Sequence, residues 1–153
     1  MKKYLLPLIL ILCLILTIPI YSADLYGTYD QRIKLTVSNT NIDAELTWFP
    51  ITVSLTSTAG EEVFTEFDAD ADFDRIAFTT SDESTQLYAD CELFDDSEQK
   101  AIYHVSKTGW TISNTETTDF YMYYDNDADH NTTYISKSGN TAAQSVYDAN
   151  FKA

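Results

Sequence analysis

Residues 49–56 read FPITVSLT, and from Ile51 onward apolar and polar side chains alternate. Successive side chains of an extended strand point to opposite faces, so this pattern predicts a strand with one buried face. Residues 32–37 read RIKLTV and repeat the alternation. The chain therefore contains two half-buried strands, whose predicted inward-facing residues are Ile33, Leu35, Val37, Ile51, Val53 and Leu55.

Further stretches of β-branched and aromatic residues are separated by short runs rich in Asp, Asn, Ser and Gly, which is typical of strands joined by turns. The connections are too short for helical crossovers, so neighbouring strands are expected to run antiparallel. We predict an all-β domain, an antiparallel β-sandwich with a jelly-roll-like arrangement. One short helical turn is expected at residues 61–67. The additional predicted strands are residues 75–79, 86–94, 101–107 and 120–124.

The first 23 residues resemble an export signal. Lys2 and Lys3 precede an uncharged apolar run over residues 5–20, and the Tyr-Ser-Ala sequence at residues 21–23 is a candidate processing site. We predict a signal peptide over residues 1–23 and a secreted or cell-surface location. An uncleaved segment that anchors the protein in a membrane is the alternative.

The chain is strongly acidic, with a formal net charge of -15 at pH 7. Nucleic acids are held mainly by Lys and Arg side chains, so a nucleic-acid partner is not expected. Cys13 lies within the predicted signal peptide, which leaves Cys91 alone in the mature chain. No internal disulfide is therefore expected, and a packed core must provide the stability.

Residues 24–145 are predicted to form one β-sandwich domain, because no linker or repeat divides them. Within this domain, residues 131–143 are rich in Thr, Ser, Asn and Gly and are expected to run as a loop. A second apolar group that includes Tyr147 follows. We interpret residues 146–153 as the start of a linker or of a truncated following domain.

Residues 48–152 resemble an extracellular family described as domain of unknown function 2341. Five segments of the chain occur in the order and spacing of that family. The resemblance implies a β-sandwich module without an established activity. Such modules occur in surface, secreted and phage-associated proteins, often before a concanavalin A-like, laminin-G type lectin domain, and residues 146–153 would then begin that domain. Asp82-Glu83 replaces the usual Asp-Gly turn of the family, and positive backbone angles cost Glu more than Gly. The segments are FPITV at 49–53, DRIAFT at 74–79, YADCELFD at 88–95, FYMYY at 120–124 and VYDANF at 146–151.

Two acidic ladders, in which aspartates occupy alternate positions, suggest a calcium site. Calcium takes six to eight oxygen ligands from flexible segments, and clustered carboxylates outside the cell suit it. An EF-hand is excluded, because Phe73 and His130 stand where its loop requires glycine. The alternative is that the ladders are solvated acidic loops. The candidate ligands are Asp68, Asp70, Asp72 and Asp74 in the first ladder and Asp125, Asp127 and Asp129 in the second.

Aromatic residues among many Asp and Asn side chains indicate a carbohydrate or cell-surface polymer as ligand, because sugar faces stack on aromatic rings while polar groups bind the hydroxyls. Packing in the core is the alternative for these rings, since alternating aromatic residues are also typical of a strand. The candidate ligand-binding residues are Tyr88, Trp110, Tyr121 and Tyr123.

No catalytic motif stands out, and we expect a protein that is not an enzyme. Asp90 and Glu92 lie on the same face of a predicted strand and could act as a glycosidase pair, but the solvated face of a half-buried strand explains them more simply. His104 and His130 have no metal-ligand spacing, and Cys91 is expected to be a buried small side chain.

Three functions remain open at this point. The leading one is a noncatalytic recognition or adhesion module that binds carbohydrate or a surface, with calcium as a possible aid, as part of a longer multidomain protein or assembly. The alternative is a structural subunit or spacer of a surface filament or phage-related appendage, joined through exposed strand edges. The third is a glycan-processing enzyme.

Overall fold

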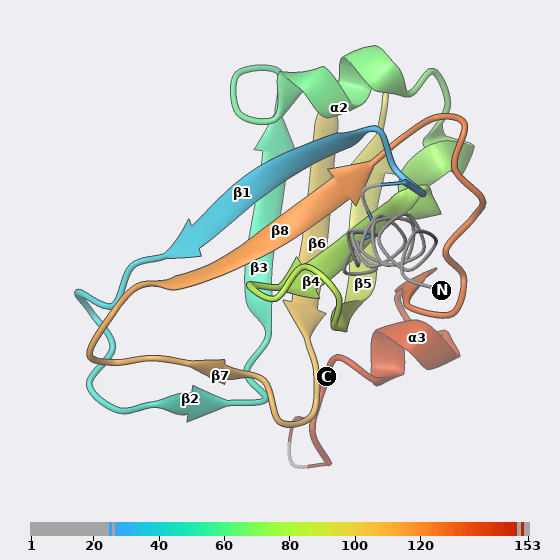
Figure 1. Ribbon diagram of the computed structural model, residues 1–153. Coiled ribbons are helices and arrows are strands. Elements are labelled where there is room, and N and C mark those ends of the chain that lie inside the picture. The colour runs from blue at the N-terminus through green and yellow to red at the C-terminus, as the bar shows by residue number, and fades with distance from the viewer. Residues whose placement is uncertain (1–24, 26, 150, 152–153) are drawn as a thin grey trace, which may run out of the picture.

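The computed structural model describes residues 25, 27–149 and 151, so the signal peptide predicted for residues 1–23 lies outside the described part of the chain. Strands dominate the described residues (Figure 1). None of the helices in this part of the chain is both long and apolar enough to cross a bilayer. In chain order the elements are β1 Gln31–Val37, β2 Leu46–Thr47, β3 Ile51–Thr56, α2 Glu61–Glu66, the 3-10 helix η1 Asp70–Asp74, β4 Ile76–Thr80, β5 Gln86–Asp95, β6 Lys100–Ser106, β7 Thr111–Ile112, β8 Thr118–Tyr124, β9 Ile135–Lys137 and α3 Thr141–Gln144.

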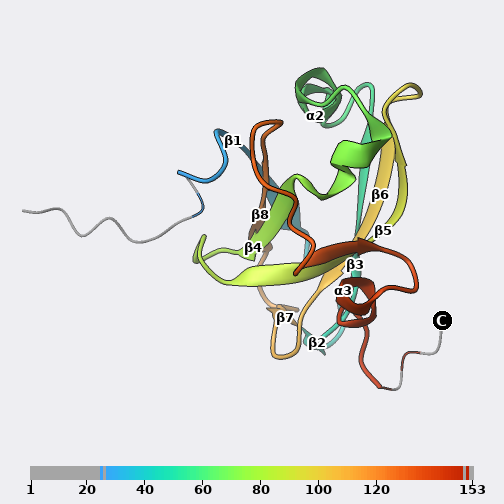
Figure 2. The same cartoon turned by 90° about the vertical axis from the view of Figure 1, so that its right-hand side faces the viewer.

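One antiparallel sheet curls over on itself to make the two layers of the fold. Its strand order is β1-β8-β4-β5-β6-β3. Strands β1, β8 and β4 form one layer, and β5, β6 and β3 form the other (Figure 2). The layers are joined where β4 pairs with β5 through only Phe78 with Leu87 and Thr79 with Gln86. This arrangement confirms the predicted all-β, sandwich-like antiparallel fold.

The core fills the space between the two layers, and the alternation of side chains accounts for it. Ile33 of β1 lies opposite Met122 of β8, and Val53 of β3 lies opposite Tyr103 of β6. Burying these side chains contributes about 25 cal/mol per Å² of apolar surface removed from water. The inward-facing residues that share the main cluster include Ile76, Phe78, Leu87, Ala89, Cys91, Val105, Phe120 and Tyr124.

Helix α2 corresponds to the helical turn expected at residues 61–67, and it lies across one end of the sandwich (Figure 1). Its buried Val63 and Phe64 point into the core, and the ring of Phe64 lies 5.8 Å from that of Phe94. Phe67 packs on the same ring at 6.1 Å. The helix begins after Gly60, whose φ of 81° is a conformation that glycine adopts without steric cost.

The long side of the sandwich opposite the junction of β4 and β5 stays open between β1 and β3. These strands are the two ends of the strand order, so among the described residues neither pairs with a further strand on its outer edge. An apolar groove of about 310 Å³ lies between them, lined by residues such as Leu35, Val53 and Phe120. The sheet therefore curls into a sandwich without closing into a barrel.

Segments that local sequence patterns did not reveal cover part of the outer face of the first layer and extend the second layer. On the first layer, Tyr29 packs on Tyr123 of β8 with 6.2 Å between the ring centroids. On the second layer, residues predicted as a loop at 131–143 contain β9 and α3. Strand β9 pairs with β5 in parallel over three residues, which is too short a stretch to show a strand period.

The turn at residues 82–83 forms without the glycine that the family resemblance led us to expect. Glu83 adopts a φ of 61°, which is unusual for a residue with a side chain. The carboxylate of Asp82 accepts hydrogen bonds from the backbone N–H groups of Ser84 and Thr85, at 2.9 and 2.8 Å, and these bonds stabilise the turn. The hydrogen bond from the Thr85 hydroxyl, and then the one from the Thr85 backbone N–H, hold the pKa of Asp82 well below its usual range.

Candidate functional site

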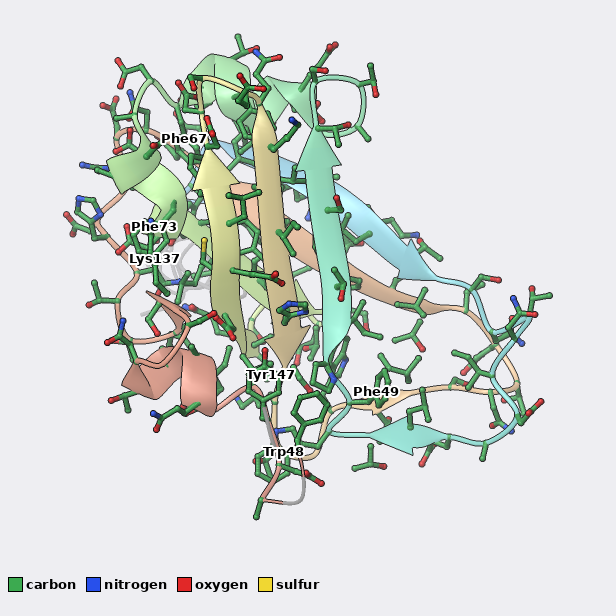
Figure 3. All side chains as sticks on the ribbon, turned by 180° about the vertical axis from the view of Figure 1, so that it is seen from behind. Trp48, Phe49, Phe67, Phe73, Lys137 and Tyr147 are labelled. Atoms are coloured by element: carbon green, nitrogen blue, oxygen red, sulfur yellow. The ribbon has the colours of Figure 1, made fainter. Side chains whose placement is uncertain are left out.

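An aromatic cleft lies at the end of the second layer where β6 ends and β3 begins. Its volume is about 650 Å³, and four rings line it: Trp48, Tyr88, Tyr147 and Phe151. Trp48 precedes β3, Tyr88 belongs to β5, and the other two follow α3. Figure 3 shows Trp48 and Tyr147 together at this end, beside Phe49, whose side chain is 46% exposed. Three distant segments of the chain therefore build one aromatic surface.

Asp90 holds the C-terminal wall of the cleft against the sheet. It is buried on β5 and accepts hydrogen bonds from Ser138 Oγ at 2.7 Å and from the Tyr147 hydroxyl at 2.8 Å. Burial, and then the hydrogen bond to Asp90 and its negative charge, raise the pKa of Tyr147, so this hydroxyl stays protonated. The buried Val146 completes the attachment. The chain is therefore packed on the sheet well beyond residue 145.

The rings of Tyr147 and Phe151 form a stacked pair within this wall. Their centroids are 4.7 Å apart and their planes differ by 21°. Asp148 fixes the turn between them, because both its backbone carbonyl and its carboxylate accept the N–H of Phe151. Phe151 is nevertheless 50% exposed. An exposed ring held in place in this way is suited to contact with a ligand rather than to core packing.

Trp48 carries two further features of a functional residue. Its φ of 51° is strained for a residue with a side chain. Its indole Nε1 is buried and finds no hydrogen-bond acceptor among the described residues. The backbone N–H of Trp48 donates to Trp110 O at 2.9 Å, which fixes the position of the residue. Buried polar groups without a partner are rare in folded proteins and require an explanation.

Glu92 lies at a β-bulge on β5, on the outer face of the same layer. The register with β6 shifts between Cys91 and Leu93. Glu92 Oε2 lies 2.7 Å from His104 Nε2, and Thr52 Oγ lies 3.1 Å from His104 Nδ1. The two carboxylates that could be imagined as a glycosidase pair thus differ in their surroundings: Asp90 is buried under the C-terminal segment, and Glu92 is exposed beside a histidine.

The four aromatic residues proposed from sequence lie in different parts of the fold. Tyr88 lines the cleft. Trp110 belongs to the main core, where it packs on Phe120 at 5.5 Å. Tyr123 is fully buried in the second cluster, and Tyr121 lies on the outer face of β8 with the Arg32 guanidinium 4.9 Å from its ring centroid.

Sequence reasoning missed Trp48, Tyr147 and Phe151 as ligand-binding candidates. Tyr147 and Phe151 were visible as a late apolar group, but nothing local connects them with β5. Trp48 stands directly before the alternating stretch that defines β3. The usable signal was the concentration of aromatic residues in segments outside strands, where core packing does not require them.

The two acidic ladders lie side by side, and the protein's own groups bind many of their carboxylates. In the first ladder, Asp72 is paired with Arg75 at 3.0 Å and Asp74 with His130 at 2.5 Å. Arg75 also donates to the backbone carbonyl of Ala128, between the residues of the second ladder. Across the described residues no group of three or more His, Cys, Asp or Glu side chains is arranged to hold a metal ion.

The remaining contacts of the ladders are also internal. Asp125 is buried and accepts the backbone N–H groups of Asp30 and Asp127, at 2.9 and 2.7 Å. Asp70 accepts the N–H of Asp96 at 2.8 Å. Burial, and then the nearby charge of Asp70, raise the pKa of Asp96. The ladders thus connect η1 with the loops around it.

Asn131, the first residue of an Asn-Thr-Thr glycosylation sequence, is used within the fold. Its amide Nδ2 donates to Ile76 O at 3.0 Å and to Gln86 Oε1 at 3.1 Å. Its backbone N–H donates to Asp74 O. Both hydrogens of the amide group are therefore engaged in holding the loop after β8 against β4 and β5.

Comparison of the chain with protein-family models, with curated proteins and with solved structures found no match.

Proposed function

We propose that this chain is an exported, noncatalytic recognition module that binds carbohydrate through the aromatic cleft. The observation that supports this proposal is the convergence of Trp48, Tyr88, Tyr147 and Phe151 on one hollow. Its volume of about 650 Å³ lies within the range of small-ligand sites. Sugar rings present apolar C–H faces that stack on such aromatic side chains.

The rim of the cleft supplies the polar groups that sugar hydroxyls need. Thr108, Gln144, Ser145 and Asp148 line it beside the rings. Hydroxyl groups can donate to carboxylate and amide oxygens and accept from hydroxyl and amide donors. A mixed surface of rings and short polar side chains therefore fits a glycan better than it fits a purely apolar ligand.

A glycan array followed by titration calorimetry on residues 24–153 tests the proposal. We expect saturable binding to at least one oligosaccharide, and Trp48→Ala to weaken it at least about tenfold, because one stacking surface is lost. Tyr121→Ala is the matched control, since it removes an aromatic ring on the other layer, and it should leave affinity unchanged. Circular dichroism and melting curves check that each variant is folded. Absence of binding to any glycan, or equal losses in both variants, would reject the proposal.

The open edges of β1 and β3 favour a second function, in which the chain is a structural subunit of a surface filament. Each copy would offer two different edges, and head-to-tail pairing between such edges builds open chains. A net charge of -15 opposes close contact between copies, which is why we rank this function second. Light scattering at low and high salt distinguishes the two: filaments that appear as salt screens the charge would support assembly.

A further inference from the structure

We infer that the aromatic cleft selects neutral glycans and discriminates against those that carry carboxylate or sulfate groups. This inference rests on the proposed function and adds the chemical class of the ligand. It starts from the charges around the cleft. Among the described lining residues, Asp148 is the one that is charged, and neither Lys nor Arg is present.

The surroundings of the cleft strengthen its negative potential. Asp90 is buried directly behind Tyr147 and holds that ring by a hydrogen bond of 2.8 Å. Glu92 is close enough to contribute, through its negative charge, to the raised pKa of Tyr147. A buried carboxylate acts through a medium of low dielectric constant, so salt and water screen it less than a surface charge.

Among the described residues, two cations near the cleft, Lys107 and His104, already have partners of their own. The Nζ of Lys107, the residue that precedes the lining Thr108, donates to Gln86 O at 3.0 Å and lines a neighbouring hollow with Asp82. His104 lies beside Glu92, with 2.7 Å between the interacting atoms. An anionic sugar in the cleft would lose its hydration and face like charges, which is a repulsive element of specificity.

Neutral sugars meet no such penalty and can donate hydrogen bonds to Asp148, the carboxylate among the described lining residues. Carboxylates are strong acceptors for sugar hydroxyl donors, and hydrogen bonds to a charged acceptor are stronger than neutral ones. The rings of Trp48 and Tyr147 provide the stacking surface for C–H faces. The cleft therefore combines attraction for uncharged sugars with repulsion of acidic ones.

Matched pairs of ligands test the inference. Cellohexaose, xylohexaose, mannohexaose and chitohexaose would each be titrated beside a carboxymethylated or sulfated derivative of the same oligosaccharide. We expect each derivative to bind at least about tenfold more weakly than its neutral parent at low ionic strength. The difference should shrink in 0.5 M salt, where the Debye length is only about 4 Å.

Two variants that each remove one negative charge show whether the cleft itself causes the difference in affinity between neutral and acidic glycans. Asp148→Asn should narrow the gap between neutral and acidic ligands, because it removes the charge at the rim. Glu116→Gln removes one negative charge from a different hollow, near β7 and β8, and should leave the gap unchanged. An equal effect of both variants would mean that overall charge, and not the cleft, sets the discrimination, and this would overturn the inference.

The outcomes also separate this inference from the proposed function. If acidic derivatives bind as tightly as their parents, and Trp48→Ala still abolishes binding, the recognition function stands and the selectivity is wrong. If neither class of glycan binds, the recognition function fails and the selectivity fails with it.

Discussion

The aromatic cleft and the acidic ladders are both rich in residue types that bind ligands, but they differ in how far their side chains are engaged within the fold. In the ladders, Arg75, His130 and backbone N–H groups engage the carboxylates of Asp72, Asp74 and Asp125. In the cleft, rings stay at the surface, and the Trp48 indole nitrogen has no acceptor among the described residues. An abundant residue type therefore says less about a site than how many of its side chains remain at the surface after folding.

The largest effect is expected from breaking the contact between the two ladders. Arg75→Ala removes the partner of Asp72, which is 8% exposed, and the donor to Ala128. We expect a loss of about 2–3 kcal/mol in the free energy of unfolding, because an almost buried carboxylate loses its cation. Urea unfolding at neutral pH measures it.

Lys100→Ala is the control for this experiment. Lys100 pairs with Glu98 at 3.5 Å, and both side chains are more than half exposed, so the expected loss is at most about 0.5 kcal/mol. If Arg75→Ala cost no more than Lys100→Ala, the ladders would not be structural, and the contrast with the cleft would disappear.

The next largest effect is a loss of stability in alkaline solution. It tests Tyr29, whose pKa responds to the charges of ladder carboxylates. Burial, and then the charges of Asp74, Asp125 and Asp129, raise the pKa of Tyr29 to about 12. A raised pKa means that the folded state keeps its proton when the unfolded state has lost it. Stability is therefore complete below about pH 10, the ordinary range for tyrosine, and falls as the pH rises towards about 12.

Tyr29→Phe should flatten this alkaline decline, and melting temperatures between pH 8 and pH 12 would measure the change. Burial also raises the pKa of Tyr124 to about 12, so part of the decline should persist. A decline of unchanged steepness in the variant would show that Tyr29 does not sense the ladders.

Two substitutions of Tyr147 separate its contribution to stability from its contribution to glycan binding, and their expected effects are smaller. Tyr147→Phe removes the hydroxyl that donates to Asp90 and keeps the ring that stacks on Phe151. We expect a loss of about 1 kcal/mol in stability, because Asp90 retains its bond from Ser138, and little change in glycan affinity. Tyr147→Ala should lower affinity at least about tenfold. Equal affinities for the two variants would remove this ring from the proposed site.

The smallest effect is expected from calcium. The carboxylates of Asp70, Asp72, Asp74 and Asp125 already accept internal hydrogen bonds, so a calcium ion would compete with these bonds, and we expect an affinity near the millimolar range of extracellular modules. At about 2 mM calcium this corresponds to a gain of about 0.6 kcal/mol in stability. Titration calorimetry should detect heat release, and a melting curve should shift upward and return after chelation. A flat titration with an unchanged melting curve would leave the ladders with a structural role.

The outer strands of the fold could be predicted from the sequence, because β1 and β3 show a period of two that follows from burial of one face. Residues 32–37 and 49–56 correspond to β1 and β3, and the expected turn at 61–67 corresponds to α2. Burial by distant segments could not be predicted in this way. Tyr123 alternates as an outward residue of β8, yet Tyr29 covers it from a segment far away in the sequence.

The same limit explains why the cleft was only partly foreseen. Tyr88 was proposed from composition, but its neighbours Tyr147 and Phe151 reach it through the short parallel pairing of β9 with β5. Three paired residues leave no periodic signal, and parallel pairing requires a long connection. Asp90, which attaches this segment, looked like the polar face of an ordinary strand.

The parallel pairing of β9 with β5 also sets an order of events during synthesis. Strands β1 to β8 can close the sandwich as soon as they have emerged, whereas the wall that carries Tyr147 and Phe151 must wait for β9 and α3. If the cleft binds a ligand as we propose, a nascent chain that has folded only its layers cannot yet hold that ligand. Recognition would begin only when the final turns of the domain have been delivered to the compartment where it works.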